Sequence, residues 1–107
     1  MSRYHDIAAT LIDIECELRS LGQWDKVAPP PEALRSEQPF AVDTLSFSQW
    51  LQFVFIPRIR YLLDSDSELP SACAIAPMAE EMYRGLSLPI ADLLSALEKI
   101  DGLISEP

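Results

Sequence analysis

The chain is poor in the residues that build catalytic and metal sites. Its 107 residues include one histidine, two cysteines and three glycines. His5 lies close to the amino terminus, where we expect a side chain that faces solvent. Cys16 and Cys73 lack the CxxC spacing of a redox pair or of half a zinc site, so we expect reduced, structural thiols. The composition therefore predicts no metal ion, no cofactor and no catalytic residue.

Basic residues and long apolar runs are also scarce. Eight Lys plus Arg stand against 17 Asp plus Glu, which gives a net charge of −9. Such a surface repels phosphate backbones and anionic membranes. The densest apolar run, 51–59, is interrupted by polar residues and is shorter than the roughly 20 residues of a membrane span. Acidic residues also break the apolar stretch that an amino-terminal signal peptide needs. We expect a soluble, cytoplasmic protein that binds neither nucleic acid nor membrane.

The sequence shows clear helical periodicity near both of its ends. Apolar residues recur every three or four positions over 4–21 and again over 90–104, which predicts an amphipathic helix at each end of the chain. Gly22 is a natural stop for the first helix. A shorter helix with Pro77 in its first turn is expected to run to about Tyr83 and to precede the last one.

The middle of the chain predicts a more apolar helix. Ser46 is followed three residues later by Gln49, which is the capping-box pattern, and an apolar run over 47–63 comes next. Apolar residues lie almost all round this helix, so we expect it to be central and packed by the first and last helices. Pro57 lacks an N–H, and its ring clashes with the Phe53 carbonyl in a regular helix. A kink or break is expected around these two residues.

A proline-rich connection precedes that helix. Periodicity disappears over 22–43, where four prolines make a regular helix improbable. Apolar residues such as Trp24 and Phe40 indicate that this loop is ordered and lies against the helices. The predicted fold is a single all-α domain over residues 1–107. It is a small four-helix bundle-like array with a kinked central helix and a long, ordered, proline-rich loop.

Short motifs occur in a fixed order along most of the chain. They are QPF at 38–40, DT at 43–44, WLQ at 50–52, IPR at 56–58, LLD at 62–64, LP at 69–70, AP at 76–77 and LEKID at 97–101. In this order they resemble the bacterial YqcC-like family, a family of unknown function. The resemblance implies a small helical fold and transfers no catalytic residue. Members are often encoded beside a tRNA pseudouridine synthase, so the resemblance also implies a protein partner of that kind.

Arg58 has two alternative interpretations. Val54 and Leu62 lie one helical turn to either side of it, which places its charge in the apolar sector of the helix. A buried arginine needs a partner, and Asp43 or Asp101 would supply a carboxylate within about 4 Å. Alternatively, the Pro57 kink turns Arg58 to the surface, where it receives an anionic ligand or an acidic residue of a partner.

A chain this small cannot bury every side of its middle helix. We therefore expect a non-enzymatic module that binds another protein, with a homodimer as one form of that association. The expected surface comprises Trp24, Gln38, Phe40, Gln52 and Arg58. The alternative is a small-molecule-binding protein or minor enzyme with an Arg58-lined cleft. A closed pocket with convergent polar groups favours a ligand, and a flat apolar surface favours a protein partner.

Overall fold

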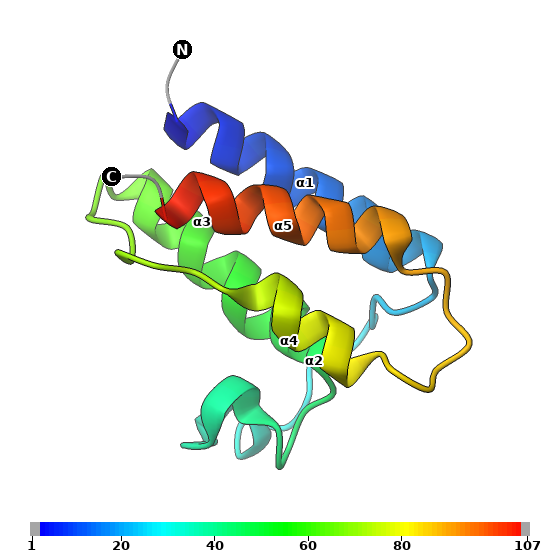
Figure 1. Cartoon of the computed structure of the whole chain (residues 1–107). Helices are drawn as coiled ribbons and strands as arrows, with labels where there is room; N and C mark the ends of the chain where they lie inside the picture. Colours follow the sequence, from blue (N-terminus) through cyan, green and yellow to red (C-terminus); the bar gives the residue numbers. More distant parts are fainter. Residues whose placement is uncertain (1–2, 106–107) are drawn as a thin grey trace.

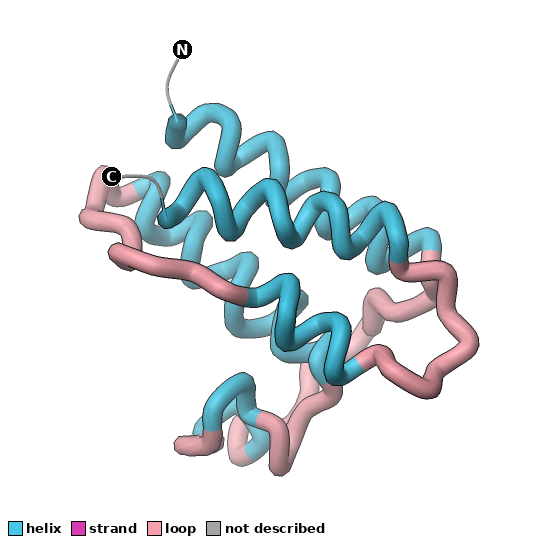
Figure 2. Tube along the Cα trace, viewed as in Figure 1, coloured by secondary structure: helices cyan, strands magenta, loops and turns pink. Residues whose placement is uncertain are grey.

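The helices of the molecule form one bundle. The computed structural model describes residues 3–105, and this part of the chain contains helices and loops without any strand (Figure 2). The elements are α1 (Arg3–Ser20), η1 (Ala33–Arg35), η2 (Pro39–Ala41), α2 (Phe47–Trp50), η3 (Leu51–Phe55), α3 (Ile56–Asp64), α4 (Ile75–Met82) and α5 (Ala91–Ser105). Because α2, η3 and α3 follow one another without a break, they make one long helix. The all-α, bundle-like prediction is confirmed.

Helices α1 and α5 form the main contact of the bundle. They lie side by side and antiparallel, so that the two ends of the described chain pack together (Figure 1). Both contribute fully buried side chains at three- and four-residue spacing, which are Ile7, Leu11, Ile14 and Leu18 from α1 and Leu93, Leu97, Ile100 and Ile104 from α5. Burying each such side chain stabilises the fold by about 1.5–3 kcal/mol. The periodicity at the chain ends therefore predicted the core correctly.

The middle helix begins at the predicted capping box. The Ser46 amide donates to Gln49 Oε1 at 2.9 Å, and the Gln49 amide donates to Ser46 Oγ at 3.1 Å. The predicted packing of α1 on this helix is confirmed by the contact of α1 with α3, whereas α5 contacts mainly α1 and α4. One side of the middle helix consequently stays open, and Tyr61 is 69% exposed there.

The irregularity predicted around Pro57 is a π-helical turn. Over η3 the backbone widens, and the Ile56 amide donates to the Leu51 carbonyl five residues back. Pro57 lies in the first turn of α3, where its missing N–H is tolerated. The wider turn accommodates a ring that a regular α-helix would bring against the Phe53 carbonyl. The chain thus passes through the proline without ending the helix.

The proline-rich loop is ordered by hydrogen bonds, as predicted. The buried Gln52 side chain holds the start of this loop, because its Oε1 accepts from the Asp25 amide at 2.9 Å and its Nε2 donates to the Asp25 carbonyl at 2.8 Å. Further along, Thr44 Oγ1 donates to the Ala33 carbonyl at 2.7 Å. In Figure 1, η1 and η2 lie below α2 and α4.

Helix α4 has Pro77 in its first turn, as predicted. Its first residue is Ile75, two residues before Pro77, and its N-cap residue Ala74 provides no side-chain hydrogen bond. The Asp101 carboxylate of α5 supplies the acceptors instead, since the amides of Ile75 and Ala76 each donate to it at 2.8 Å.

Among the described residues, no helix combines the length and hydropathy required to span a bilayer.

Candidate functional site

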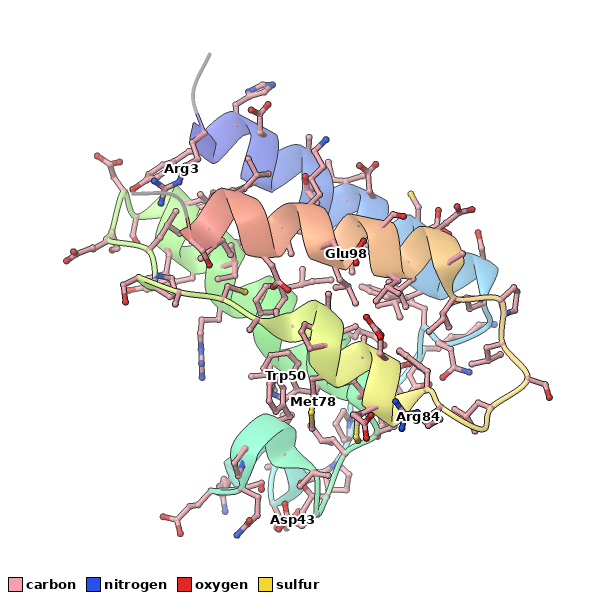
Figure 3. The ribbon with its side chains drawn as sticks, viewed as in Figure 1. Arg3, Asp43, Trp50, Met78, Arg84 and Glu98 are labelled. Carbon is pink, nitrogen blue, oxygen red and sulfur yellow. The ribbon has the colours of Figure 1, made fainter. Side chains whose placement is uncertain are left out.

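A pocket of about 220 Å³ lies between the proline-rich loop and the middle helix. Its lining residues are Leu34, Ser36, Gln38, Phe40 and Ala41 from the loop and Trp50, Val54 and Arg58 from the helix. The three helical residues are four positions apart, so they share one stripe of the helix. Figure 3 shows Trp50 on the side of the helix that faces the η1–η2 segment. We refer to this site as the Arg58 pocket.

Aromatic rings make one wall of the Arg58 pocket. The ring centroids of Phe40 and Trp50 are 4.8 Å apart in an edge-to-face arrangement. Trp50 is held from within the protein by the rings of Phe47 and Phe55, at 5.9 Å and 5.5 Å, and both of these rings are buried. Contacts of this geometry add to the stability gained by burial. The Trp50 ring is therefore a fixed surface, with Phe40 packed across it.

The loop backbone that carries Phe40 is strained. Phe40 has φ = 57° and the next residue, Ala41, has φ = 50°, a region that residues with a Cβ rarely adopt. Such conformations cost about 1–3 kcal/mol each and persist where the surrounding structure imposes them. Here the Ala41 carbonyl accepts from the amides of Thr44 and Leu45 at 3.0 Å and 2.9 Å. These hydrogen bonds help to impose the backbone conformation that places Phe40 in the lining of the pocket.

The polar side chains of the pocket differ in whether their hydrogen-bond donors already have a partner. The Ser36 hydroxyl donates to the Asp43 carboxylate and accepts from the Gln38 amide at 3.1 Å, so its proton is already used. The side chains of Gln38 and Arg58 have no hydrogen bond or ion pair with the residues described, and both are exposed. The pocket therefore offers one guanidinium and one carboxamide as donors.

The predicted ion pair of Arg58 does not form in the described part of the chain. Asp43 accepts from Ser36. Asp101 accepts from two backbone amides of α4 and from the Cys73 thiol at 3.1 Å. Both carboxylates are thus satisfied by other donors, and Arg58 lies at the surface, as in the alternative that the sequence left open. The error came from treating a position between apolar residues as buried.

Two residues of the predicted surface hold the loop in place and do not line the pocket. Gln52 is buried and bonds to the Asp25 backbone. Trp24 is half-buried, and the Arg19 guanidinium lies 4.8 Å from the centroid of its ring, within the range of a cation–π contact. Both side chains stabilise the connection that follows α1.

The other three predicted residues meet at one site. Gln38, Phe40 and Arg58 all line the Arg58 pocket. Sequence reasoning missed the remaining lining residues, which are Leu34, Ser36, Ala41, Trp50 and Val54. The four-residue spacing from Trp50 to Arg58 was the available signal, but an aromatic residue at helical spacing usually indicates core packing.

The surroundings shift the pKa values of two side chains, those of Cys73 and Tyr83. Burial raises the pKa of Cys73 to about 12, and the neighbouring Asp101 carboxylate contributes to that rise. Burial also raises the pKa of Tyr83, while its hydrogen bond with Ser48 opposes the shift. Both groups stay protonated near neutral pH, so neither is an activated nucleophile. Within residues 3–105, no three His, Cys, Asp or Glu side chains are grouped as metal ligands.

Comparisons with known proteins find close relatives over most of the chain. The DUF446 family model, described as tRNA pseudouridine synthase C, matches residues 6–103. An uncharacterized protein of Haemophilus influenzae is 39% identical over 93 residues, which cover 87% of each chain. The uncharacterized protein YqcC of Escherichia coli K12 is 36% identical over 106 residues, or 99% of this chain and 97% of that one. The solution NMR structure of E. coli YqcC aligns with a TM-score of 0.83 at 37% identity, covering 99% of this chain and 91% of that chain.

One relative is a much longer protein. The tRNA pseudouridine synthase C of Pectobacterium carotovorum is 39% identical over 85 residues, which are 79% of this chain but 23% of that protein. The matched region is therefore a minor part of the Pectobacterium chain.

Proposed function

This chain belongs to the YqcC-like DUF446 family, and from that premise we propose that it is a non-enzymatic helical module that binds a tRNA pseudouridine synthase. The observation that carries the proposal is the Pectobacterium relative, in which a segment similar to this chain is part of a protein named tRNA pseudouridine synthase C. A covalent link gives two units a high effective concentration for each other. Units that are joined in one species are good candidates for a non-covalent complex in another.

The Arg58 pocket is the contact surface that we propose for this partner. Tryptophan and arginine are among the residue types that dominate binding energy at interfaces, and here Trp50 and Arg58 line the same pocket. Its 220 Å³ is smaller than the roughly 300–1,000 Å³ of sites for drug-sized molecules. A pocket of this size suits a single side chain of a protein partner.

The charge of the chain supports a basic partner. Its net charge is −9, and a protein that binds tRNA needs a basic surface for the phosphate backbone. Opposite charge on the two molecules accelerates their encounter and favours this partner over acidic proteins.

The direct test is a binding measurement between this chain and the tRNA pseudouridine synthase C of the same organism, by calorimetry and by sedimentation. We expect a complex whose affinity falls at least about tenfold in Arg58→Ala, because the substitution removes an interface arginine. Arg60→Ala is the matched control, since Arg60 is exposed on the same helix and does not line the pocket. Absence of a complex, or equal effects of the two variants, would contradict the proposal.

A second candidate function is binding of a small molecule in the same pocket. The observation that favours it is the convergence of Arg58 and Gln38, both without a protein partner among the described residues, beside an aromatic wall. Calorimetry of the chain alone with small anions tests this candidate without the synthase.

A further inference from the structure

We propose that the Arg58 pocket binds a single carboxylate joined to a flat apolar ring. The proposal takes from the proposed function only the location of the site, and it specifies the chemistry that the site recognises. A free metabolite and an acidic group on a polypeptide both offer this chemistry.

The charged end of the ligand follows from the donors that the pocket has free. Arg58 presents a guanidinium with no ion pair to the described residues, and a guanidinium forms paired hydrogen bonds with a carboxylate. The Gln38 carboxamide supplies a further N–H donor at the same site. A ligand anion here gains two kinds of donor without displacing an existing ion pair.

The local charge selects a monoanion over a dianion. Among residues 3–105, Arg58 is the one cation that lines the pocket, while the Asp43 carboxylate is hydrogen-bonded to the lining residue Ser36. The whole chain adds a net charge of −9. One guanidinium neutralises one charge, and the second charge of a phosphate monoester would remain without a cation while the net charge of the chain repels it. A carboxylate therefore fits this site better than a phosphate.

The apolar end of the ligand follows from the shape and lining of the pocket. A protein cavity of about 150 Å³ holds benzene, so 220 Å³ accommodates one ring and a carboxylate. The rings of Trp50 and Phe40, which meet at an interplanar angle of 63°, both line the pocket and offer aromatic contacts for such a ring. Val54 and Leu34 supply the remaining apolar lining.

The strained loop gives the pocket its preformed shape. Two consecutive non-glycine residues with positive φ, Phe40 and Ala41, hold one side of the pocket, and buried rings fix Trp50 on the other. A preformed site avoids the ordering cost of binding. Backbone strain of this kind is often found at ligand-binding sites.

The test uses the chain alone with 3-phenylpropionate, its uncharged amide and phenylphosphonate, followed by NMR of the tryptophan indole N–H groups. We expect 3-phenylpropionate to shift the Trp50 signal and to leave Trp24 unchanged, because Trp24 lies outside the pocket. Trp24→Phe assigns the two signals. The amide and the phosphonate are expected to bind at least about tenfold more weakly, since neither forms the matched monoanion pair with arginine.

Variants separate the role of Arg58 from a general effect of charge. Arg58→Gln is expected to weaken binding of 3-phenylpropionate at least about tenfold, and Arg60→Gln to leave it unchanged. An acetylated dipeptide ending in phenylalanine with a free carboxylate forms a second arm. Tighter binding of this peptide than of 3-phenylpropionate identifies a polypeptide source, and the reverse identifies a metabolite.

Three outcomes would overturn the inference. They are equal binding of the acid and the amide, tighter binding of the phosphonate, and no change at Trp50 up to about 10 mM acid, a concentration that saturates even millimolar sites. None of these measurements involves the synthase. A chain that binds the acid but not the synthase would refute the proposed function and leave this inference standing.

Discussion

The Cys73 thiol is held in its neutral form by its surroundings. It is half-buried, and its Sγ donates to Asp101 Oδ1 at 3.1 Å. Burial is the largest cause of its raised pKa, followed by the hydrogen bond and the negative charge of Asp101. Cys16, by contrast, is exposed on α1. The two cysteines therefore differ in both access and environment.

We expect alkylating reagents to modify Cys16 and to spare Cys73 of the folded protein between pH 8 and pH 11. Burial and Asp101 raise the pKa of Cys73 from its ordinary value of 9.0 to about 12, and alkylation requires the thiolate. Mass spectrometry of tryptic peptides after timed reaction with iodoacetamide measures both sites. The folded protein binds the extra proton between pH 9 and pH 12, so the same shift lowers the free energy of unfolding as pH rises through that window.

Urea-unfolded protein is the control, in which the two thiols should react at similar rates. Equal rates in the folded protein at pH 8 would show that burial and Asp101 do not protect Cys73.

The partners of single charged residues were the least predictable feature of the site. Asp101 was a reasonable partner for Arg58 on charge alone, yet it accepts from Ile75, Ala76 and Cys73. Buried backbone amides need acceptors as strongly as a guanidinium does. The sequence shows which residues carry charge, but it does not show which uncharged donors lie within reach.

At the scale of the helix, the two caps differ in how far they could be predicted. Ser46 and Gln49 cap α2 from within three residues, so the pattern is visible in the sequence. Asp101 caps α4 from another helix, 25 and 26 residues away from the amides that it accepts from. This second cap depends on how α5 packs on α4 and had no local signal. The sequence placed Pro77 correctly in the first turn of α4, but it gave no sign of the residue that caps the helix.

We expect Asp101→Ala to lower the free energy of unfolding by about 1–3 kcal/mol, because the amides of Ile75 and Ala76 lose their acceptor while remaining partly buried. Urea unfolding followed by circular dichroism measures the change. Helix α4 should also show faster amide hydrogen exchange than α1 in this variant.

Glu98→Ala is the matched control, because Glu98 is an exposed carboxylate on the same helix without a hydrogen bond or ion pair to the residues described (Figure 3). Its effect should stay within about 0.5 kcal/mol. A similar loss in both variants would mean that Asp101 acts only through the net charge of α5.

At the scale of the whole molecule, the sequence predicted the helices better than their arrangement. Helical periodicity depends on residues three and four apart, so 4–21 and 90–104 were identified correctly. The contacts of α5 with α1 and α4 involve distant residues and were only partly anticipated. The Arg58 pocket combines both cases. The residues on its helical side could be recognised from their four-residue spacing in the sequence. The shape of its loop side depends on positive φ angles at Phe40 and Ala41, and these residue types do not predict such angles.

The charge of the molecule leads to the last prediction, that salt weakens the proposed complex mainly by slowing association. The described chain measures 37 × 30 × 23 Å and carries a net charge of −9. The Debye length is about 30 Å at 0.01 M salt and about 3 Å at 1 M. At low salt the charge of this chain therefore acts across the whole molecule, whereas at high salt only groups in contact interact.

Stopped-flow measurements with the synthase over this range should show an association rate that falls at least about tenfold and a dissociation rate that changes little. Binding of 3-phenylpropionate at Arg58 should be less sensitive, because a pair in direct contact is screened less than distant charges. A salt-independent association rate would show that the acidic surface plays no part in recognition. The partner would then be selected by the pocket alone, and the surplus of acidic residues would need another cause.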